Sequence, residues 1–231
     1  MPKGLGRGYF FQGEHLTPEP AHPRAVAFTD GQNLFHAVRE AFGYSHPNFD
    51  VRALVTAICQ ARAWRVTGVR FYTGIPDSRI NPQWHRFWSR KLGVMGRERV
   101  HVFARPLRYR PRTIRLRDGS TRSILIGEEK GIDVRLALDA VRMAHRREYD
   151  VALILSQDQD LSEVAEEIRS IAREQARWIK IASAFPTSPS APNRRGIDKT
   201  DWIRIDRAIY DACLDRRDYR RRVPPPPKGG S

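Results

Sequence analysis

The sequence predicts an α/β fold with a mostly parallel sheet flanked by helices. Short apolar runs alternate with segments of helical periodicity, the pattern of strands joined by crossover helices. The chain has 231 residues, enough to bury a large core in one domain. Its hydrophobic content of 40% excludes a chain that is disordered throughout. The longest aliphatic runs, such as Val151 to Leu155, are far too short to span a membrane.

Six segments are expected to be strands because each is short, apolar and bounded by turn residues. In chain order they are 25–29, 68–73, 100–106, 151–156, 178–184 and 202–205. Apolar residues that recur three and four positions apart predict helices at 33–42, 51–63, 81–92, 132–147, 161–175 and 208–214. The aromatic residues Trp84, Phe87 and Trp88 follow helical spacing and are assigned to the core rather than to a base-stacking surface.

One interval interrupts the alternation of strands and helices. Residues 105–122 contain seven arginines and one acid, and Asp118-Gly119 is a hairpin signal. We therefore predict a basic β-ribbon inserted into a domain that spans 24–215. Residues 1–23 are expected to form an N-terminal arm without chemistry of its own, and residues 216–231 a basic, proline-rich tail.

The charge balance points to a polyanionic partner. Lysine and arginine number 41 against 26 acids, a net charge of +15. Arginine offers a planar fork for phosphate, and tyrosine offers a face on which bases stack. The alternative to a nucleic-acid-binding role is that these charges form an ordinary solvated surface. The candidate nucleic-acid contacts in the ribbon are Arg105, Arg108, Tyr109, Arg110, Arg112, Arg115 and Arg117, with Tyr219 as a further aromatic face near the tail.

The two cysteines, Cys59 and Cys213, form no C-x-x-C pair and are interpreted as buried hydrophobic residues. No apolar stretch of the signal-peptide type is present near the start. A reducing cytoplasm is therefore the expected location, without membrane association.

Acidic residues follow the ends of two expected strands and open one helix. The first strand runs into Asp30, with Asn33 three residues later, and the fourth runs into Ser156, Asp158 and Asp160. Residues 129–133 (EKGID) open the fourth helix. In a doubly wound sheet the first and fourth strands are neighbours, and ligands bind beyond their carboxyl ends. These acids are therefore expected to meet at one edge of the sheet.

Carboxylates brought this close repel one another unless a cation neutralises them. Oxygen ligands favour Mg²⁺ or Mn²⁺, and no His/Cys cluster with the spacing of a zinc site is present. Taken singly, each acid is better explained as a helix cap than as a functional residue. Their convergence is the argument for a metal site.

Three segments of the chain resemble the signature segments of NYN-domain proteins, a family of the PIN-like nuclease group. They are residues 28–34 (FTDGQNL), 129–139 (EKGIDVRLALD) and 156–161 (SQDQDL), in the order of the family. The resemblance covers about 24–206. It implies a Rossmann-like sheet whose clustered acids hold Mg²⁺ or Mn²⁺ and hydrolyse RNA phosphodiesters.

Carried over by position, the resemblance implies that Asp30, Asp133 and Asp158 are catalytic metal ligands. Asp160 is implied as a ligand or a helix cap, and Asn33 as a residue that orients phosphate or water. Ser156 and Lys130 are implied as supporting neighbours of the ligands. The chain has Gln157 where the family often has glycine, and Leu161 where it often has an aromatic residue.

The expected function is a metal-dependent ribonuclease in which a metal-activated water attacks the phosphodiester. An endonuclease is expected, although the sequence alone leaves endonucleolytic and exonucleolytic action, DNA as substrate and the oligomeric state open. The alternative is a catalytically inactive RNA-binding or protein-docking module of the same fold. A phosphatase with an aspartyl intermediate predicts Asp-x-Asp after the first strand, which Asp30-Gly31-Gln32 does not supply.

Overall fold

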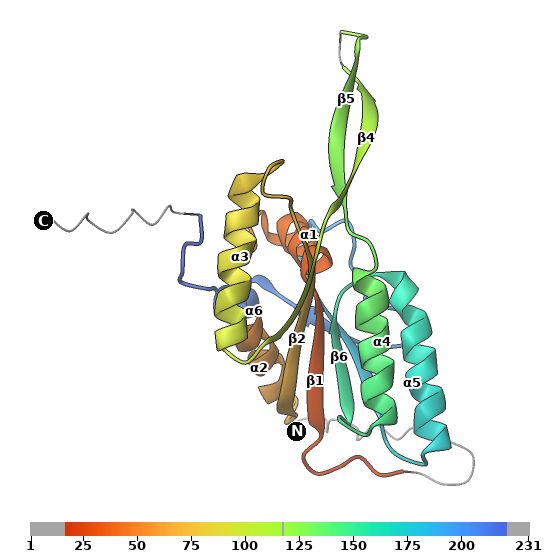
Figure 1. Ribbon diagram of the computed structural model, residues 1–231. Coiled ribbons are helices and arrows are strands. Elements are labelled where there is room, and N and C mark those ends of the chain that lie inside the picture. Colours follow the sequence, from red (N-terminus) through yellow and green to blue (C-terminus); the bar gives the residue numbers. More distant parts are fainter. Residues whose placement is uncertain (1–16, 117, 221–231) are drawn as a thin grey trace, which may run out of the picture.

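The computed structural model describes residues 17–116 and 118–220 and shows a twisted sheet between two layers of helices (Figure 1). The strands are β1 (Arg24–Asp30), β2 (Arg65–Ile75), β3 (His101–Pro106), β4 (Arg108–Arg115), β5 (Thr121–Glu128), β6 (Val151–Leu155), β7 (Lys180–Pro186) and β8 (Asp201–Ile205). The helices are α1 (Gly31–Phe42), α2 (Val51–Gln60), α3 (Pro82–Arg97), α4 (Ile132–His145), α5 (Ser162–Glu174) and α6 (Arg207–Asp211), with a single 3₁₀ turn at Gln159–Leu161.

Six strands form one sheet in the order β3-β2-β1-β6-β7-β8, and every neighbouring pair is parallel. The predicted α/β fold is therefore confirmed. The order reverses between β1 and β6, which pair from Ala25 opposite Val151 to Thr29 opposite Leu155. The first and fourth expected strands are thus neighbours, as the doubly wound order requires, and their carboxyl ends lie side by side.

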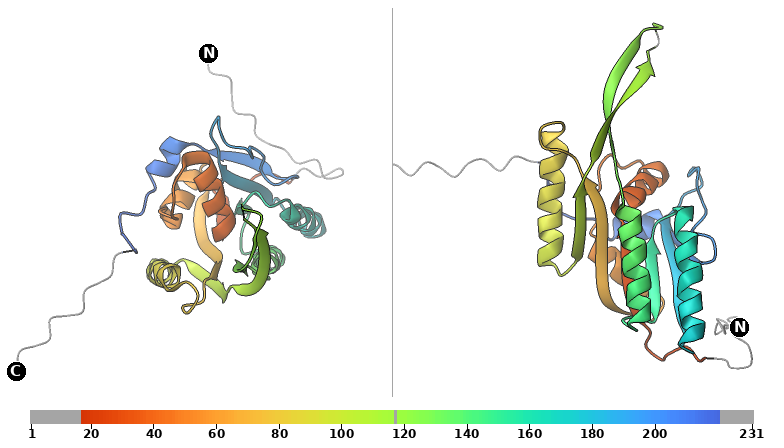
Figure 2. Two further views of the ribbon diagram at one scale, coloured as in Figure 1. Left: turned by 90° about the horizontal axis from the view of Figure 1, so that it is seen from above. Right: turned by 45° about the vertical axis from the view of Figure 1, so that its right-hand side comes forward.

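Two separate cores hold the helices to the sheet. Alternate residues of β1 point to opposite faces, so that Ala27 packs with α1, α2 and α3, and Phe28 packs with α4 and α5. Figure 2 shows the two helical layers on either side of the strands. Trp84, Phe87 and Trp88 lie in or against the first core, as the sequence predicts.

Several elements are longer than their sequence pattern predicts. The strand β2 extends from Arg65 to Ile75. The helix α3 continues through Gly93 and Gly96 to Arg97, because Met95 on its last turn is buried in the first core. Burial of one apolar side chain outweighs the helix-weakening effect of two glycines here.

The predicted ribbon is present and extends beyond its expected limits. The strands β4 and β5 pair antiparallel from Arg108 opposite Glu128 to Arg115 opposite Thr121, whereas Arg105 belongs to β3. Because β4 follows the carboxyl end of β3, the ribbon projects from the edge of the sheet at which β1 and β6 end (Figures 1 and 2). Arg117 at its tip lies outside the described residues.

The end segments expected from the sequence fall mainly outside the described residues, at 1–16 and 221–231. The described part of the tail packs on the domain. The Tyr219 ring is buried 5.8 Å from the Phe87 ring, and its hydroxyl donates to Asp215 at 2.6 Å. The expectation that Tyr219 offers a free face for bases is therefore wrong. Among residues 17–116 and 118–220, no helix combines the length and the apolar composition needed to cross a bilayer.

Candidate functional site

The carboxyl end of β1 delivers Asp30 into the site in a defined orientation. Asp30 is the last residue of the strand and the N-cap of α1, and its Oδ1 accepts a hydrogen bond of 3.0 Å from the Asn33 backbone N–H. The residue is 7% exposed. Gly31 follows because a Cβ at that position would collide with the ring of Phe71.

The carboxyl end of β6 supplies the second group of polar residues. Ser156 is buried, and its hydroxyl accepts from the Asp158 N–H at 3.1 Å. Asp158 in turn caps the 3₁₀ turn, because its Oδ1 accepts from the Asp160 N–H at 3.1 Å. Asp158 is half-buried and Asp160 is exposed. Asp158 therefore caps the turn and is also exposed enough to bind a ligand.

Asn33 joins the two acid-bearing loops. Its side-chain oxygen accepts a hydrogen bond of 2.9 Å from the Gln157 backbone N–H. The Gln157 side chain then donates to the Arg195 carbonyl at 2.8 Å, which ties the loop after β6 to the segment before β8. Gln157, which stands where a glycine is common in the family, therefore has a structural role that glycine cannot fill. In the structure Asn33 positions the loop that carries Asp158.

Glu129 is a site residue that the sequence reasoning did not select. It follows the last residue of β5, and its carboxylate accepts from the Gly74 N–H on β2. Gly74 is needed for this approach, because a Cβ there would collide with Glu129 and with Leu107. The sequence signal was present in residues 129–133 (EKGID), where a second acid precedes Asp133. It went unrecognised because nothing local shows that the ribbon returns its second strand to the site.

Asp133 lies in the first turn of α4 and is half-buried. Lys130 is exposed in the loop that precedes it. Gly131 between them has φ +71°, a left-handed conformation that glycine adopts without strain. This turn brings Glu129 and Asp133 to the same edge of the sheet.

The acids influence one another electrostatically, which places them in one cluster. The pKa of Asp30 is raised to about 6, mainly by burial and also by the charges of Asp133 and Asp158, against the hydrogen bond from Asn33. Burial likewise raises the pKa of Glu129 to about 7, with added repulsion from Asp30 and Asp133. The three segments predicted to converge therefore do so, and Glu129 joins them.

The donor set suits a hard divalent cation. Within residues 17–116 and 118–220, no salt bridge involves Asp30, Glu129, Asp133, Asp158 or Asp160, in a protein with a net charge of +15. Buried carboxyls without a cationic partner favour protonation or a bound cation, and oxygen donors favour Mg²⁺ or Mn²⁺. In this described part of the chain, no three His, Cys, Asp or Glu side chains are close enough to hold one ion together. Ion binding therefore requires the carboxylates to draw together.

A cavity of about 360 Å³ lies at the carboxyl ends of β2 and β3. It is lined by the ends of β2 and β3 and by the beginning of α3, with Ile75 and Ala104 among its apolar residues and His85 and Arg105 among its polar ones. Ile75 directly follows Gly74, which donates to Glu129. None of the five acids lines this cavity, which shares only the edge of the sheet with them.

The ribbon carries its arginines mainly on one face. Directly paired residues of an antiparallel ribbon share a face, and alternate residues along a strand change face. Arg108, Arg110 and Arg112 are therefore on the face of Ile126 and Ile124, whereas Tyr109 and Arg115 are on the other face. All four of these arginines are exposed. The Tyr109 hydroxyl accepts from the Asp77 N–H at 3.1 Å and anchors the base of the ribbon beside the cavity.

The chain is similar to one solved structure and to one family of domains. The solved structure is a crystal structure of a protein of unknown function from Vibrio parahaemolyticus RIMD 2210633. It shares 22% identity, has a TM-score of 0.48, and the match covers 82% of this chain and 97% of that one. A search of curated proteins found no match. The family model of the NYN domain matches residues 24–191, a range that includes Asp30, Glu129, Asp133, Asp158 and Asp160. The chain therefore belongs to the NYN domain family, within the PIN-like nuclease group.

Proposed function

We propose that the protein is a Mg²⁺- or Mn²⁺-dependent ribonuclease. One observation carries the proposal: acids from the ends of β1, β5 and β6 and from the start of α4 repel one another at one edge of the sheet, and no cation of the described chain pairs with them. The family supports it, because nucleases of the PIN-like group in general use divalent metal ions and act on RNA.

Asp30, Asp133 and Asp158 are the proposed metal ligands, with Glu129 beside them and Asp160 available from the exposed end of its loop. A bound Mg²⁺ or Mn²⁺ supplies a water of lowered pKa and neutralises charge on the phosphate. The chain itself performs the positioning. The Asn33 N–H orients Asp30, the Asn33 side chain holds the loop after β6, and the hydroxyl of Ser156 fixes the turn that presents Asp158.

RNA is the proposed substrate, because the exposed arginines of the ribbon stand at the edge where the acids lie. An acidic cluster repels a polyanion, so a nuclease of this kind needs flanking cations to retain its substrate. The cavity at the ends of β2 and β3, with His85 and Arg105 in its lining, offers space for part of a nucleotide at the same edge of the sheet. The expected cytoplasmic location stays a prediction.

A second candidate is an RNA-binding module without turnover. The observation in its favour is that no three ligating side chains of the described residues reach one ion as the structure stands. This candidate predicts RNA binding that Mn²⁺ does not turn into cleavage.

Labelled RNA incubated with the purified protein and Mn²⁺ tests the proposal. Cleavage is expected, with complete loss in EDTA and a loss of at least about 100-fold in Asp30→Asn and in Asp158→Asn, since both remove a proposed ligand charge. Glu129→Gln is expected to reduce cleavage as well. Asp198→Asn, a charge change in an exposed ion pair with Arg195, serves as the control and is expected to cleave normally.

Circular RNA tests the mode of action, because only an endonuclease opens a circle. DNA of the same sequence tests whether the protein distinguishes ribose from deoxyribose in its substrate. RNA that is bound but stays intact at every Mn²⁺ and Mg²⁺ concentration supports the inactive module instead. Cleavage that persists in the Asp30→Asn and Asp158→Asn proteins would contradict the assigned site.

A further inference from the structure

A cluster of arginines lies on the α4 side of the sheet, outside the acidic site. At its centre Asp139 is 1% exposed, and its two oxygens accept from the Tyr72 hydroxyl at 3.0 Å and from three guanidinium groups. The three are Arg70 at 3.0 Å, Arg135 at 3.1 Å and Arg142 at 2.9 Å. Three positive charges surround one carboxylate, so the group has a net charge of +2.

A fourth arginine connects this group to the acidic site. The guanidinium carbons of Arg105 and Arg135 lie 5.1 and 5.3 Å from the centre of the Phe103 ring. Arg105 also reaches Gly131, where it would meet an added Cβ. The arginine cluster, defined as Arg70, Arg105, Arg135 and Arg142, therefore begins at the turn between Glu129 and Asp133. The ring and the carboxylate hold these guanidiniums in place in advance of any ligand.

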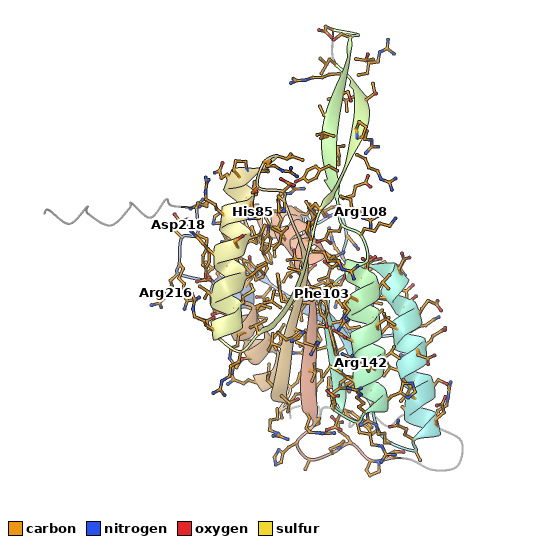
Figure 3. The ribbon with its side chains drawn as sticks, viewed as in Figure 1. His85, Phe103, Arg108, Arg142, Arg216 and Asp218 are labelled. Carbon is orange, nitrogen blue, oxygen red and sulfur yellow. The ribbon has the colours of Figure 1, made fainter. Side chains whose placement is uncertain are left out.

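In Figure 3, Arg108, Phe103 and Arg142 lie one below the other from the base of the ribbon down the side of α4. Arg135 and Arg142 are two turns apart on one helix face, about 10 Å along its axis. Their side chains are 36% and 48% exposed, whereas Arg70 is 15% exposed. Two guanidiniums are therefore open to a ligand, and the third is mainly a support.

The local field is positive. Burial lowers the pKa of His101, and the charges of Arg70, Arg135 and Arg142 lower it further, against the opposing charge of Asp139. A network that only fastened α4 to β2 would need one cation for one carboxylate. The excess charge, the exposure and the extended course fit a ligand with regularly spaced phosphates better than a single small anion.

We propose that the arginine cluster, which runs from the base of the ribbon along α4, binds the sugar–phosphate backbone of the RNA that enters the acidic site. The inference rests on the proposed function for the identity of the ligand. It extends the substrate class to RNA long enough to reach from the ribbon, across the acids, to α4.

Equilibrium binding of fluorescent single-stranded RNA to the Asp30→Asn protein, without divalent metal and over a range of salt concentrations, tests this inference. Arg142→Gln is expected to weaken binding about fivefold and to reduce the slope of log affinity against log salt by about 0.7, the effect of one lost phosphate contact. The double change with Arg135→Gln is expected to reduce the slope by about 1.4. Arg142→Lys, which keeps the charge, is expected to restore most of the slope.

Arg173→Gln is the matched control, because Arg173 is an exposed arginine on the neighbouring helix α5 and lies outside the cluster. The melting temperature of each variant is measured in parallel. Unchanged affinity and slope in the double variant, or equal losses in Arg173→Gln, would overturn the inference and leave a purely structural network. A short RNA that stops at the acidic site is expected to bind the Asp30→Asn protein equally well with and without the Arg135→Gln and Arg142→Gln changes.

The two proposals fail separately. If wild-type protein cleaves RNA and the double variant binds normally, only the role of the arginine cluster is lost. If wild-type protein cleaves nothing but the double variant loses affinity and slope, the cluster stands and the nuclease assignment falls. Absence of any RNA binding at low salt overturns both.

Discussion

Asp30 combines two roles that compete at the level of a single side chain. It caps α1 through one oxygen, and burial, together with the charges of Asp133 and Asp158, raises its pKa to about 6. The cap fixes the orientation of the carboxylate, and the burial makes its ionised form costly. A residue in this position is a source of strain until a cation binds, as is common for functional sites.

Replacing Asp30 by asparagine is expected to stabilise the metal-free protein at pH 8. The folded pKa of Asp30 lies above its ordinary value of 3.8, so its favourable contribution is complete below about pH 4 and is lost as the pH rises through 6. Asparagine still accepts from the Asn33 N–H but carries no charge. Urea unfolding in EDTA should show a gain of the order of 2 kcal/mol at pH 8 and none at pH 4.

The wild-type and Asp30→Asn proteins also allow metal binding to be measured independently of catalytic activity. Mn²⁺ is expected to raise the melting temperature of the wild-type protein and to leave that of Asp30→Asn almost unchanged. Asp160→Asn, a change of the same kind at an exposed position, should show no gain at pH 8 in EDTA. A lower stability of Asp30→Asn at pH 8 would contradict the electrostatic account of this site.

At the scale of elements, the ribbon both extends from the sheet and shapes the site. Its first strand continues from β3 after a single residue, Leu107, and its second strand ends directly before Glu129. The composition of the segment predicts positive charge, but strand pairing decides where the charge points. Arg108, Arg110 and Arg112 share one face, and Arg115 points away from it.

Substitution of Arg108, Arg110 and Arg112 by alanine is expected to weaken RNA binding and to flatten its salt dependence, with a loss of slope of about 2 for three phosphate contacts. Single variants test which face of the ribbon contacts the RNA. Arg112→Ala should lower the slope more than Arg115→Ala, although both arginines are exposed. Fluorescence titrations over a range of salt concentrations measure both effects. An unchanged slope in the triple variant would exclude the ribbon as a phosphate-binding element.

At the scale of the whole molecule, the C-terminal segment completes the first core. Tyr210 packs 5.3 Å from Phe42, and Tyr219 packs against Phe87. Lys91 is 1% exposed, donates to the Phe49 carbonyl at 2.7 Å and pairs with Asp215 at 3.4 Å. The family match ends at residue 191, but the folded unit extends about thirty residues further.

A chain limited to residues 17–191 is therefore expected not to fold cooperatively, whereas residues 17–220 should. The shorter chain lacks β8 and α6, exposes the rings of Phe42 and Phe87, and leaves the Lys91 ammonium buried without Asp215. Thermal unfolding followed by near-ultraviolet circular dichroism compares the two chains. Asp215→Asn in the full chain should cost about 3 kcal/mol, since it removes only one partner of a buried pair. A cooperative transition in the shorter chain would refute this role of the C-terminal segment.

The sequence by itself determined the α/β class and the presence of a basic ribbon, and β1 and β6 became neighbours once the doubly wound order was assumed. Apolar periodicity and turn residues are local properties of the sequence, whereas the strand order was taken from the general rule for doubly wound sheets. With that order, the sequence also placed Asp30, Asp133 and Asp158 at one edge of the sheet, where their mutual repulsion is found. The full lengths of β2 and α3 could not be predicted, because burial by distant residues extends both elements.

Only the tertiary structure decided the identity of Glu129 as a member of the acidic cluster, the burial of Tyr219 and the arrangement of three arginines around Asp139. Each depends on segments that are far apart in the chain. Glu129 meets Gly74, Tyr219 meets Phe87, and Asp139 meets Arg70. Such contacts follow from how the strands are ordered and how tightly the helices pack on them, and no local pattern of residue types contains that information.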